Sequence, residues 1–232
     1  MRIVVGTSGW QYREWRGNFY PEKMKEPDML GYYATRLNSV EVNYTFRRTP
    51  PPTTFEKWRE QVPSSFEFVL KVSQAITHFK RLRDTGPDLE RLMASATVLG
   101  GQLGPLLVQL PPNLKLDQPR LADFLAAMPP GARPALEFRD RSWHTDAIFE
   151  TLHANNAAMC LAETDEDAAP RVATADWGYL RLRKAEYGES ELNGWLDFVR
   201  GQSWGEAAVF FKHENEARGP RFATRFMELV SA

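Results

Sequence analysis

The chain contains eight short apolar runs, and each of them leads into a charged, amide or hydroxyl residue. Segments of helical period separate the runs, which is typical of βα units and of a parallel sheet. A length of 232 residues is that of one (β/α)8 barrel. We therefore expect a single-domain α/β TIM (β/α)8 barrel over residues 1–232. The expected strands are Ile3–Gly6, Ser39–Val42, Phe66–Leu70, Pro105–Val108, Pro134–Phe138, Ala157–Ala162, Gly178–Leu182 and Ala207–Phe211.

Seven segments between and after these runs have apolar spacing or capping signals of helices. They are Pro27–Asn38, Thr53–Gln61, Asp88–Leu99, Asp117–Met128, Thr145–Asn155, Glu189–Arg200 and Arg218–Val230. Between Glu163 and Trp177 the pattern lacks a full helix, so we expect a reduced unit between strands 6 and 7. The carboxyl ends of the strands meet on one face of a parallel barrel, and active sites lie there. The polar residues that end the runs are therefore the candidate site.

The composition limits the classes of function. Lys and Arg number 29 against 30 Asp and Glu, so any attraction for anions must be local. Cys160 is the only cysteine, which excludes an internal disulfide and fits a reducing cytoplasm. We see no secretion signal and no run of the roughly 18 apolar residues that a membrane span needs, so we expect a cytoplasmic protein without a membrane partner. The oligomeric state stays open.

Several blocks of sequence resemble one known family. They are Gly-Thr-Ser-Gly-Trp at 6–10, Ser-Val-Glu-Val-Asn at 39–43, Leu-Val-Gln-Leu-Pro-Pro at 107–112, Leu-Glu-Phe-Arg at 136–139, Trp-Gly-Tyr-Leu-Arg at 177–181 and Phe-Lys-His at 211–213. In this order they are similar to the YecE-like domain-of-unknown-function family, over nearly the whole chain. The resemblance implies a TIM-barrel fold and no particular reaction.

The chain departs from the family pattern at two places. Arg47 follows Thr45-Phe46 where the family has an aromatic residue, and Arg183-Lys184 stands where the family tends to His-Gly. Both changes add positive charge to the expected mouth of the barrel.

Two strands carry paired polar residues that share a face. Glu41 and Asn43 are two residues apart on the second strand, and Glu137 and Arg139 are two apart on the fifth. A carboxylate inside a barrel is costly unless it is paired. Glu41 and Glu137 are therefore either structural ion-pair partners of nearby cations or general acids and bases with shifted pKa values.

Other strand ends carry groups with alternative roles. Lys71 could bind an anion, which we prefer, or lose its proton and act as a base or Schiff-base former. Lys212 and His213 are adjacent, so only one of them points inward, and the sequence does not decide which. His213 is a candidate acid/base catalyst. The remaining candidate substrate-binding residues are Thr7, Ser8, Trp10, Tyr12, Asn43, Gln109, Arg139, Trp143, Arg181 and Arg183.

Neither a metal nor another cofactor is expected. The four histidines lack HxH or HxxxH spacing, and cations surround the carboxylates. The basic mouth favours a small anionic partner. Our first hypothesis is therefore an enzyme, a metal-independent hydrolase or isomerase, for a phosphorylated or carboxylated substrate. Arg139, Arg181 and Lys71 would bind the anion, and Trp10 and Trp143 would cover it.

Three other functions stay open. Arginines among aromatic residues suit a barrel that binds or processes single-stranded nucleic acid, by base stacking along a phosphate track. A pair among Glu41, Glu137 and Glu163 would suit a glycoside hydrolase, which needs two carboxylates about 5–10 Å apart. A binding protein without catalysis is the third.

Overall fold

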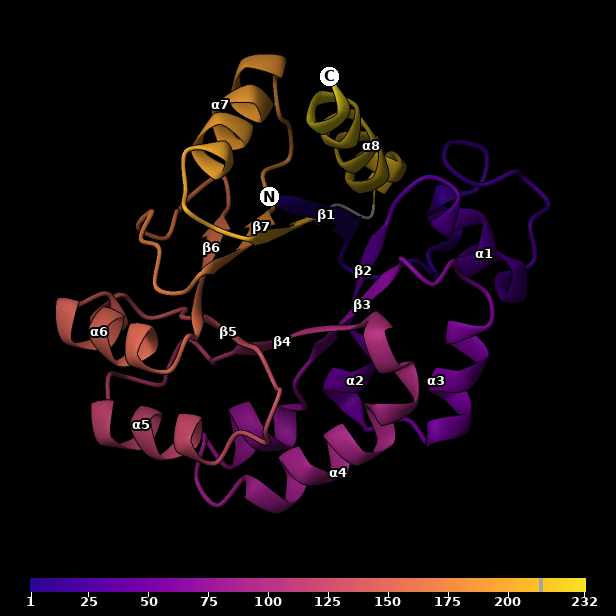
Figure 1. Ribbon diagram of the computed structural model, residues 1–232. Helices are drawn as coiled ribbons and strands as arrows, with labels where there is room; N and C mark the ends of the chain where they lie inside the picture. Colours follow the sequence, from indigo (N-terminus) through magenta and orange to yellow (C-terminus); the bar gives the residue numbers. More distant parts are fainter. Residues whose placement is uncertain (213–214) are drawn as a thin grey trace.

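The computed structural model describes residues 1–212 and 215–232, and its centre is a sheet of eight parallel strands (Figure 1). Each strand overlaps one of the predicted apolar runs, and the predicted and observed ends differ by at most two residues. The strands are β1 (Arg2–Thr7), β2 (Ser39–Val42), β3 (Glu67–Lys71), β4 (Leu103–Gln109), β5 (Pro134–Glu137), β6 (Ala158–Glu163), β7 (Trp177–Leu182) and β8 (Glu206–Phe211).

The strands follow one another around a nearly closed barrel, in the order β1-β8-β7-β6-β5-β4-β3-β2. At the seam between β1 and β2, an isolated parallel bridge joins Ser8 to Glu41. A side chain completes this seam: the Tyr33 hydroxyl accepts from Thr7 N at 2.8 Å and donates to Ser39 O at 2.9 Å. The predicted α/β barrel of parallel strands is therefore confirmed.

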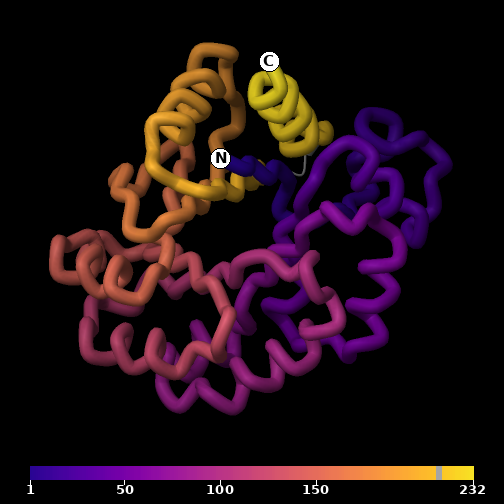
Figure 2. The backbone as a smooth tube through the Cα atoms, in the orientation of Figure 1, coloured from indigo at the N-terminus to yellow at the C-terminus, as the bar shows by residue number. Residues whose placement is uncertain are grey.

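Helices surround the barrel (Figures 1 and 2). They are α1 (Met29–Ala34), α2 (Tyr44–Arg47), α3 (Pro52–Arg59), α4 (Gly86–Ala96), α5 (Gln118–Ala126), α6 (Asp146–Ala154), α7 (Glu189–Arg200) and α8 (Arg218–Ser231). Shorter turns include the 3-10 turn η1 (Arg13–Trp15) and the π-helical turn η3 (Ala75–Phe79). No helix forms within 164–176, so the reduced unit between β6 and β7 is confirmed. Across the described residues, no helix combines the length and the apolar character that a membrane crossing requires.

Successive residues of a strand point to opposite faces, so the barrel has an inner and an outer apolar layer. The inner layer consists of Val4, Val69, Leu107, Ala135, Ala158, Cys160, Trp177, Tyr179, Ala208 and Phe210. Two residues further along β3, β4 and β7, the same alternation places Lys71, Gln109 and Arg181 on the inner face. The apolar layer therefore ends in a polar layer at the carboxyl ends of the strands.

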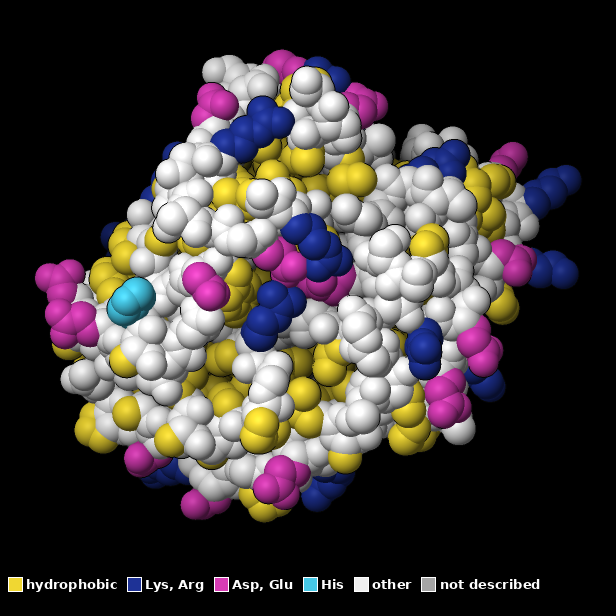
Figure 3. Space-filling model, viewed as in Figure 1, with side chains coloured by type: hydrophobic (Ala, Val, Ile, Leu, Met, Phe, Trp, Pro, Cys, Tyr) yellow, Lys and Arg dark blue, Asp and Glu magenta, His cyan; other side chains and the backbone are white. Residues whose placement is uncertain are grey.

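An ion network lies at the opposite, amino-terminal end of the barrel. Arg2 Nη1 lies 2.7 Å from Glu67 Oε2 and 2.6 Å from Glu206 Oε2, and Arg133 Nη1 lies 2.9 Å from Glu206 Oε1. Two arginines thus face two glutamates. Figure 3 shows basic and acidic side chains gathered near the middle of the molecule, in the region where Figure 1 labels the N-terminus and β1.

The aromatic segment after β1 is an ordered part of the outer layer. Trp15 and Tyr20 are buried, and Phe19 packs edge-on against Tyr32 and Tyr33 of α1. Figure 2 shows this indigo segment at the edge of the molecule beside α1. Its aromatic residues therefore mainly stabilise the first βα unit.

Candidate functional site

A cluster of charged and amide side chains fills the carboxyl end of the barrel. Glu41 comes from β2, Lys71 ends β3, Gln109 ends β4, Glu137 ends β5, and Arg181 lies in β7. All five are buried. Five strands thus contribute to one polar layer, which is where barrels place their active sites.

Arg181 is the centre of this cluster. Its Nη2 donates to Glu41 Oε1 at 2.7 Å, and its Nη1 donates to Glu137 Oε2 in a short hydrogen bond. Arg181 is 2% exposed, and the two glutamates are 0% and 1% exposed. Nη2 also approaches Ser8 Oγ at 3.4 Å. One buried guanidinium therefore pairs with two carboxylates whose burial removes them from bulk solvent, and the three groups together keep one negative charge that the neighbouring cations offset.

Gln109 links this centre to Lys71. Its amide Nε2 donates to Glu137 Oε2 at 2.9 Å, so its carbonyl Oε1 faces the lysine and accepts from Lys71 Nζ at 3.0 Å. Nζ also lies 4.1 Å from the centre of the Phe46 ring, a cation–π distance. Across the described parts of the chain, Lys71 forms no ion pair with a carboxylate.

The surroundings lower the pKa values of both Glu137 and Lys71, which favours the charged form of the carboxylate and disfavours the charged form of the amine. Burial alone would raise the pKa of Glu137, but Arg181 and two further arginines lower it to about 2. Burial and Arg181 lower the pKa of Lys71 to about 8, against the opposing effect of two carboxylates. Glu137 is thus a permanent counter-ion, whereas Lys71 titrates near neutral pH.

Two more arginines lie at the rim. Arg139 Nε is 3.4 Å and Arg183 Nη2 is 3.3 Å from Glu137 Oε1. The Arg139 side chain is 39% exposed. Both residues line a cavity of about 210 Å³, together with Glu137, Phe138, His144, Ala162, Thr164, Asp167 and Ala169. The cluster therefore opens to solvent past its arginines.

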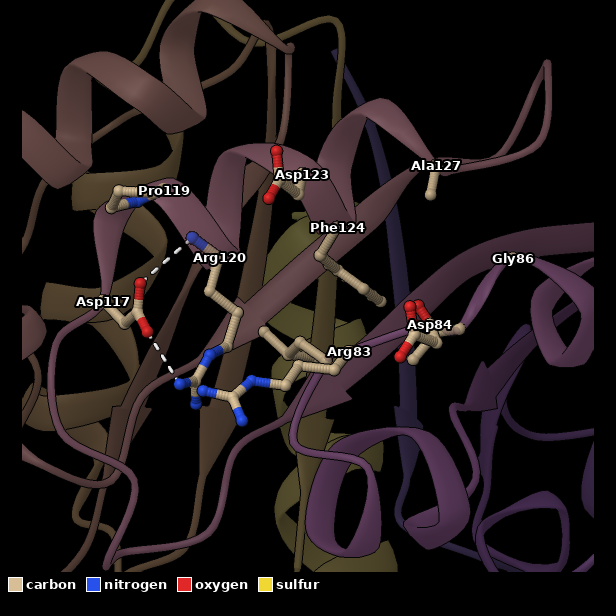
Figure 4. Close-up of a pocket in the computed structure, with 11 residues that line it drawn as sticks. Arg83, Asp84, Gly86, Asp117, Pro119, Arg120, Asp123, Phe124 and Ala127 are labelled. Atoms are coloured by element: carbon tan, nitrogen blue, oxygen red, sulfur yellow. Dashed lines mark hydrogen bonds and ion pairs between the residues drawn. The ribbon is translucent and has the colours of Figure 1, made fainter.

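A larger cavity of about 520 Å³ lies outside the barrel mouth, between residues 82–86 and the start of α5. Figure 4 shows Asp117 bonded to Arg120, through the backbone N at 3.1 Å and the guanidinium at 2.7 Å. The acids of its lining, which are Asp84, Asp117 and Asp123, outnumber the arginines Arg83 and Arg120. None of the predicted site residues lines it, and its charge does not favour an anion.

Comparison with known proteins agrees with this architecture. The family model described as "Protein of unknown function DUF72" matches residues 4–232. The chain belongs to the DUF72 family. The resemblance found in the sequence motifs is thereby confirmed at the level of that family, whose description names no reaction.

Relatives of this DUF72 protein share its fold. It is 24% identical over 229 residues to the UPF0759 protein YunF of Bacillus subtilis (strain 168). The matched region covers 92% of this chain and 79% of YunF. The crystal structure of a DUF72 protein from Thermotoga maritima MSB8 matches all of both chains with a TM-score of 0.89 and 24% identity. A DUF72 protein from Enterococcus faecalis V583 gives a TM-score of 0.77 at 16% identity, over 100% of this chain and 98% of the other.

Four residues that the sequence suggested for substrate binding have their side chains in other surroundings. Thr7 Oγ1 donates to Gly9 O at 2.7 Å within the β1–β2 seam, and Tyr12 Oη donates to Ser8 O at 2.7 Å. Trp10 is buried edge-on against Trp58 of α3. Trp143 is fully buried, stacks on Phe138 and donates to Leu114 O. The two tryptophans therefore belong to the core of the DUF72 barrel and do not form an exposed cover.

Three further predicted residues lie near the mouth or beyond the described chain. Asn43 is half-buried at the start of α2. Lys212 directly follows the last residue of β8, and its side chain is exposed. His213 lies outside the described residues.

The two departures from the family pattern have different surroundings. Arg183 joins the rim of the cluster, as described above, and Lys184 lies 2.9 Å from Glu191 and 3.4 Å from Glu163. Arg47 is exposed at the end of α2. Only Arg183 therefore adds its charge directly to the central cluster.

Sequence reasoning missed Tyr179. This fully buried residue of β7 donates from its hydroxyl to Glu41 Oε2 at 2.8 Å. It lies two residues before Arg181, so the alternation that places Arg181 inside the barrel also places Tyr179 there. That spacing was the available signal.

Metal ligands are not gathered in the part of the chain that the structure describes. No group of three or more His, Cys, Asp or Glu residues there is arranged to hold an ion. Separately, the cations of the described cluster suit an anion, and the amine of Lys71 is a group for proton or covalent chemistry.

Proposed function

We propose that this YecE-like DUF72 protein is an enzyme that acts on a small phosphorylated or carboxylated molecule, bound at the carboxyl end of the barrel. The observation that carries the proposal is the charge balance of the buried cluster. Arg181 contacts both Glu41 and Glu137, and Arg139, Arg183 and Lys71 bring the cluster to four cations against these two carboxylates. A desolvated site with surplus positive charge binds an anion strongly.

The size and position of the opening support a small ligand. The cavity beside Arg139 has about 210 Å³, which is less than the roughly 300 Å³ at the lower limit of drug-sized ligand pockets. Arginine is suited to bidentate contact with carboxylate and phosphate. An anionic group would bind at Arg139, with its remaining atoms towards Lys71 and Gln109.

The alternative functions have less support. Glu41 and Glu137 both bind Arg181, which disfavours them as the free acid and base of a glycoside hydrolase. Trp10, Trp15 and Trp143 are buried, so they are not available to stack nucleic-acid bases.

Calorimetric titration with inorganic phosphate and succinate tests the proposal. Wild-type protein is expected to bind at least one of them, and Arg139→Ala to lose about tenfold or more in affinity. Arg133→Ala is the matched control, because Arg133 is 36% exposed at the other end of β5. It is expected to bind like wild type.

A single-stranded oligonucleotide at low and high salt completes the experiment. Binding of the oligonucleotide alone, lost at high salt, would replace the proposal with nucleic-acid binding. Equal losses in Arg139→Ala and Arg133→Ala would also overturn it, because the effect would then not be specific to the mouth.

A further inference from the structure

Lys71 has an environment unlike that of a simple anion-binding lysine. It is 9% exposed, its Nζ donates to a neutral amide oxygen of Gln109, and the Phe46 ring covers it. Among the described residues no carboxylate pairs with it directly. A lysine that serves only as a point charge gains nothing from burial, since burial disfavours the ammonium form.

The groups around Lys71 hold it in one position. Gln109 cannot rotate its amide without losing the bond from Nε2 to Glu137 at 2.9 Å, so its Oε1 remains directed at Nζ. An amide oxygen accepts a hydrogen bond from either an ammonium or a neutral amine. The site therefore positions the nitrogen without requiring that it be charged.

Nearby arginines make Lys71 unnecessary for charge alone. Arg181 and Arg139 both act electrostatically on Lys71 and, with burial, lower its pKa to about 8. About a tenth of the amine is then neutral at pH 7. Burial beside another cation is the arrangement that activates nucleophilic lysines.

A neutral histidine lies in the same group of side chains. The His78 ring packs edge-on against Phe46 at 5.1 Å between centres, and Thr77 Oγ1 lies 2.8 Å from His78 Nδ1. Burial and the charges of Lys71 and Arg139 lower the pKa of His78. At pH 7 the imidazole is therefore mainly neutral and able to accept a proton.

We propose that Lys71 forms an imine with the carbonyl carbon of a small oxo acid or of a phosphorylated aldehyde or ketone. This rests on the proposed function, because Arg139 would bind the anionic group of the same substrate. It narrows the substrate class to anions that also carry a carbonyl. His78 would take protons from the carbon next to the imine.

The covalent step balances without an oxidant or reductant. The neutral Nζ attacks the carbonyl carbon, a C–N bond forms, and the carbonyl oxygen takes a proton to give a carbinolamine. That oxygen then leaves as water while the second C–N bond forms. Both hydrogens of the neutral amine end in the water, and hydrolysis reverses the sequence.

Reductive trapping tests the imine on the wild-type protein. The protein is incubated with pyruvate or dihydroxyacetone phosphate and sodium cyanoborohydride, and mass spectrometry locates the reduced adduct. Lys71 is expected to be modified at least tenfold faster than Lys115, whose side chain is 75% exposed. Lys71→Arg should lose this fast phase and Arg139→Ala should slow it.

The same samples are titrated with inorganic phosphate, so that two kinds of failure are distinguished. Phosphate binding without modification of Lys71 by either carbonyl compound overturns the imine and leaves the anion site intact. If phosphate does not bind and Lys71 is not modified, the imine and the proposed function are overturned together. Fast modification of Lys71 without phosphate binding supports the imine and removes phosphate as the anchoring group. Because the adduct is mapped on wild-type protein, the result does not depend on how well Lys71→Arg folds.

Discussion

Arg133 and Arg139 flank the same strand, β5, and their side chains are 36% and 39% exposed. Arg133 belongs to the network at the amino-terminal end of the barrel, where it and Arg2 face Glu67 and Glu206. Arg139 belongs to the network at the carboxyl end, where the two glutamates are already bound by Arg181. At the amino-terminal end two arginines thus match two glutamates in number. At the carboxyl end Arg139 joins Arg181, Arg183 and Lys71, so four cations face two glutamates.

The two ends also differ in which charges are buried. At the amino-terminal end Glu67 is buried, whereas Arg2 keeps 48% of its side chain exposed. At the carboxyl end the arginine itself is buried, between two buried carboxylates. Ion pairs at a barrel end therefore do not indicate a ligand by themselves. A surplus of positive charge over the paired carboxylates does indicate a site for an anionic ligand.

The largest effect is expected from Arg181→Ala. Removing this side chain leaves Glu41 and Glu137 buried without their common partner, which costs about 3–5 kcal/mol of unfolding free energy. Urea unfolding measures the loss, with Arg133→Ala as the matched variant at the other end. The expected loss for Arg133→Ala is much smaller, because Arg2 still contacts both glutamates.

A failure of Arg181→Ala to fold would leave its cost unmeasured, so a compensating variant is included. Arg181→Met combined with Glu41→Gln and Glu137→Gln removes all three charges and should recover most of the stability. If Arg181→Ala loses less than about 1 kcal/mol, Arg181 is not the counter-ion of the two carboxylates.

The contributions of Glu137 and Glu67, at the two ends of the barrel, to the free energy of unfolding are expected to depend on pH in opposite directions. The pKa of Glu137 falls from 4.5 to about 2 on folding, so its stabilising effect is present above pH 4.5 and is lost as pH falls towards 2. At 1.36 kcal/mol for each pKa unit the effect is roughly 3 kcal/mol. Burial raises the pKa of Glu67, so its contribution is present below pH 4.5 and is lost as pH rises through the folded-state value.

Urea unfolding of wild type, Glu137→Gln and Glu67→Gln between pH 2 and 7 measures these contributions. The difference between wild type and Glu137→Gln should shrink with falling pH, and the difference for Glu67→Gln should change in the other direction. Parallel curves would mean that the two networks respond to pH in the same way and are equivalent.

Part of the carboxyl-end network can be predicted from the sequence. Lys71, Gln109, Glu137 and Arg181 each lie at or near the end of an apolar run, and strand alternation gives them all the inward side. Local spacing is enough to predict this, because a parallel barrel brings equivalent strand ends together. The fold and the inward position of these four residues were therefore predictable.

The surroundings of other residues could not be predicted from the sequence. Alternation stops where a strand ends, and Trp143 comes six residues after Glu137, so its stacking on Phe138 depends on the path of the loop. The ion pairs were predicted only as one of two alternatives: the sequence offered Arg181 both as a ligand-binding residue and as a partner of Glu41 or Glu137, and the structure pairs it with both glutamates. Such pairing depends on distances between strands far apart in the chain.

Lys71→Met is expected to stabilise the protein at pH 7. The folded state lowers the pKa of Lys71 from 10.5 to about 8, so holding it charged at pH 7 opposes folding. Removing the charge should raise the unfolding free energy by about 3 kcal/mol, less the lost bond to Gln109. A buried group that costs stability is typical of a functional site.

The gain should depend on pH with a definite sign. Between pH 8 and 10.5 the unfolded lysine holds its proton while the folded one loses it, so wild-type stability rises there. The advantage of Lys71→Met should therefore shrink over this range, which urea unfolding at pH 7, 9 and 10 measures. A destabilised Lys71→Met at pH 7 would place Lys71 among the structural groups.

The smallest effect is expected from Arg2→Ala. Arg2 is half-exposed and therefore screened by solvent, and Arg133 remains 2.9 Å from Glu206 after its removal, so the loss should be about 1 kcal/mol or less. Phosphate affinity should be unchanged, because the whole apolar layer of the barrel separates Arg2 from the mouth. Urea unfolding and phosphate titration of the same sample check both statements. A loss as large as that of Arg181→Ala, or weaker phosphate binding, would mean that charge balance does not distinguish the two ends, and the assignment of the anion site to the carboxyl end would lose its basis.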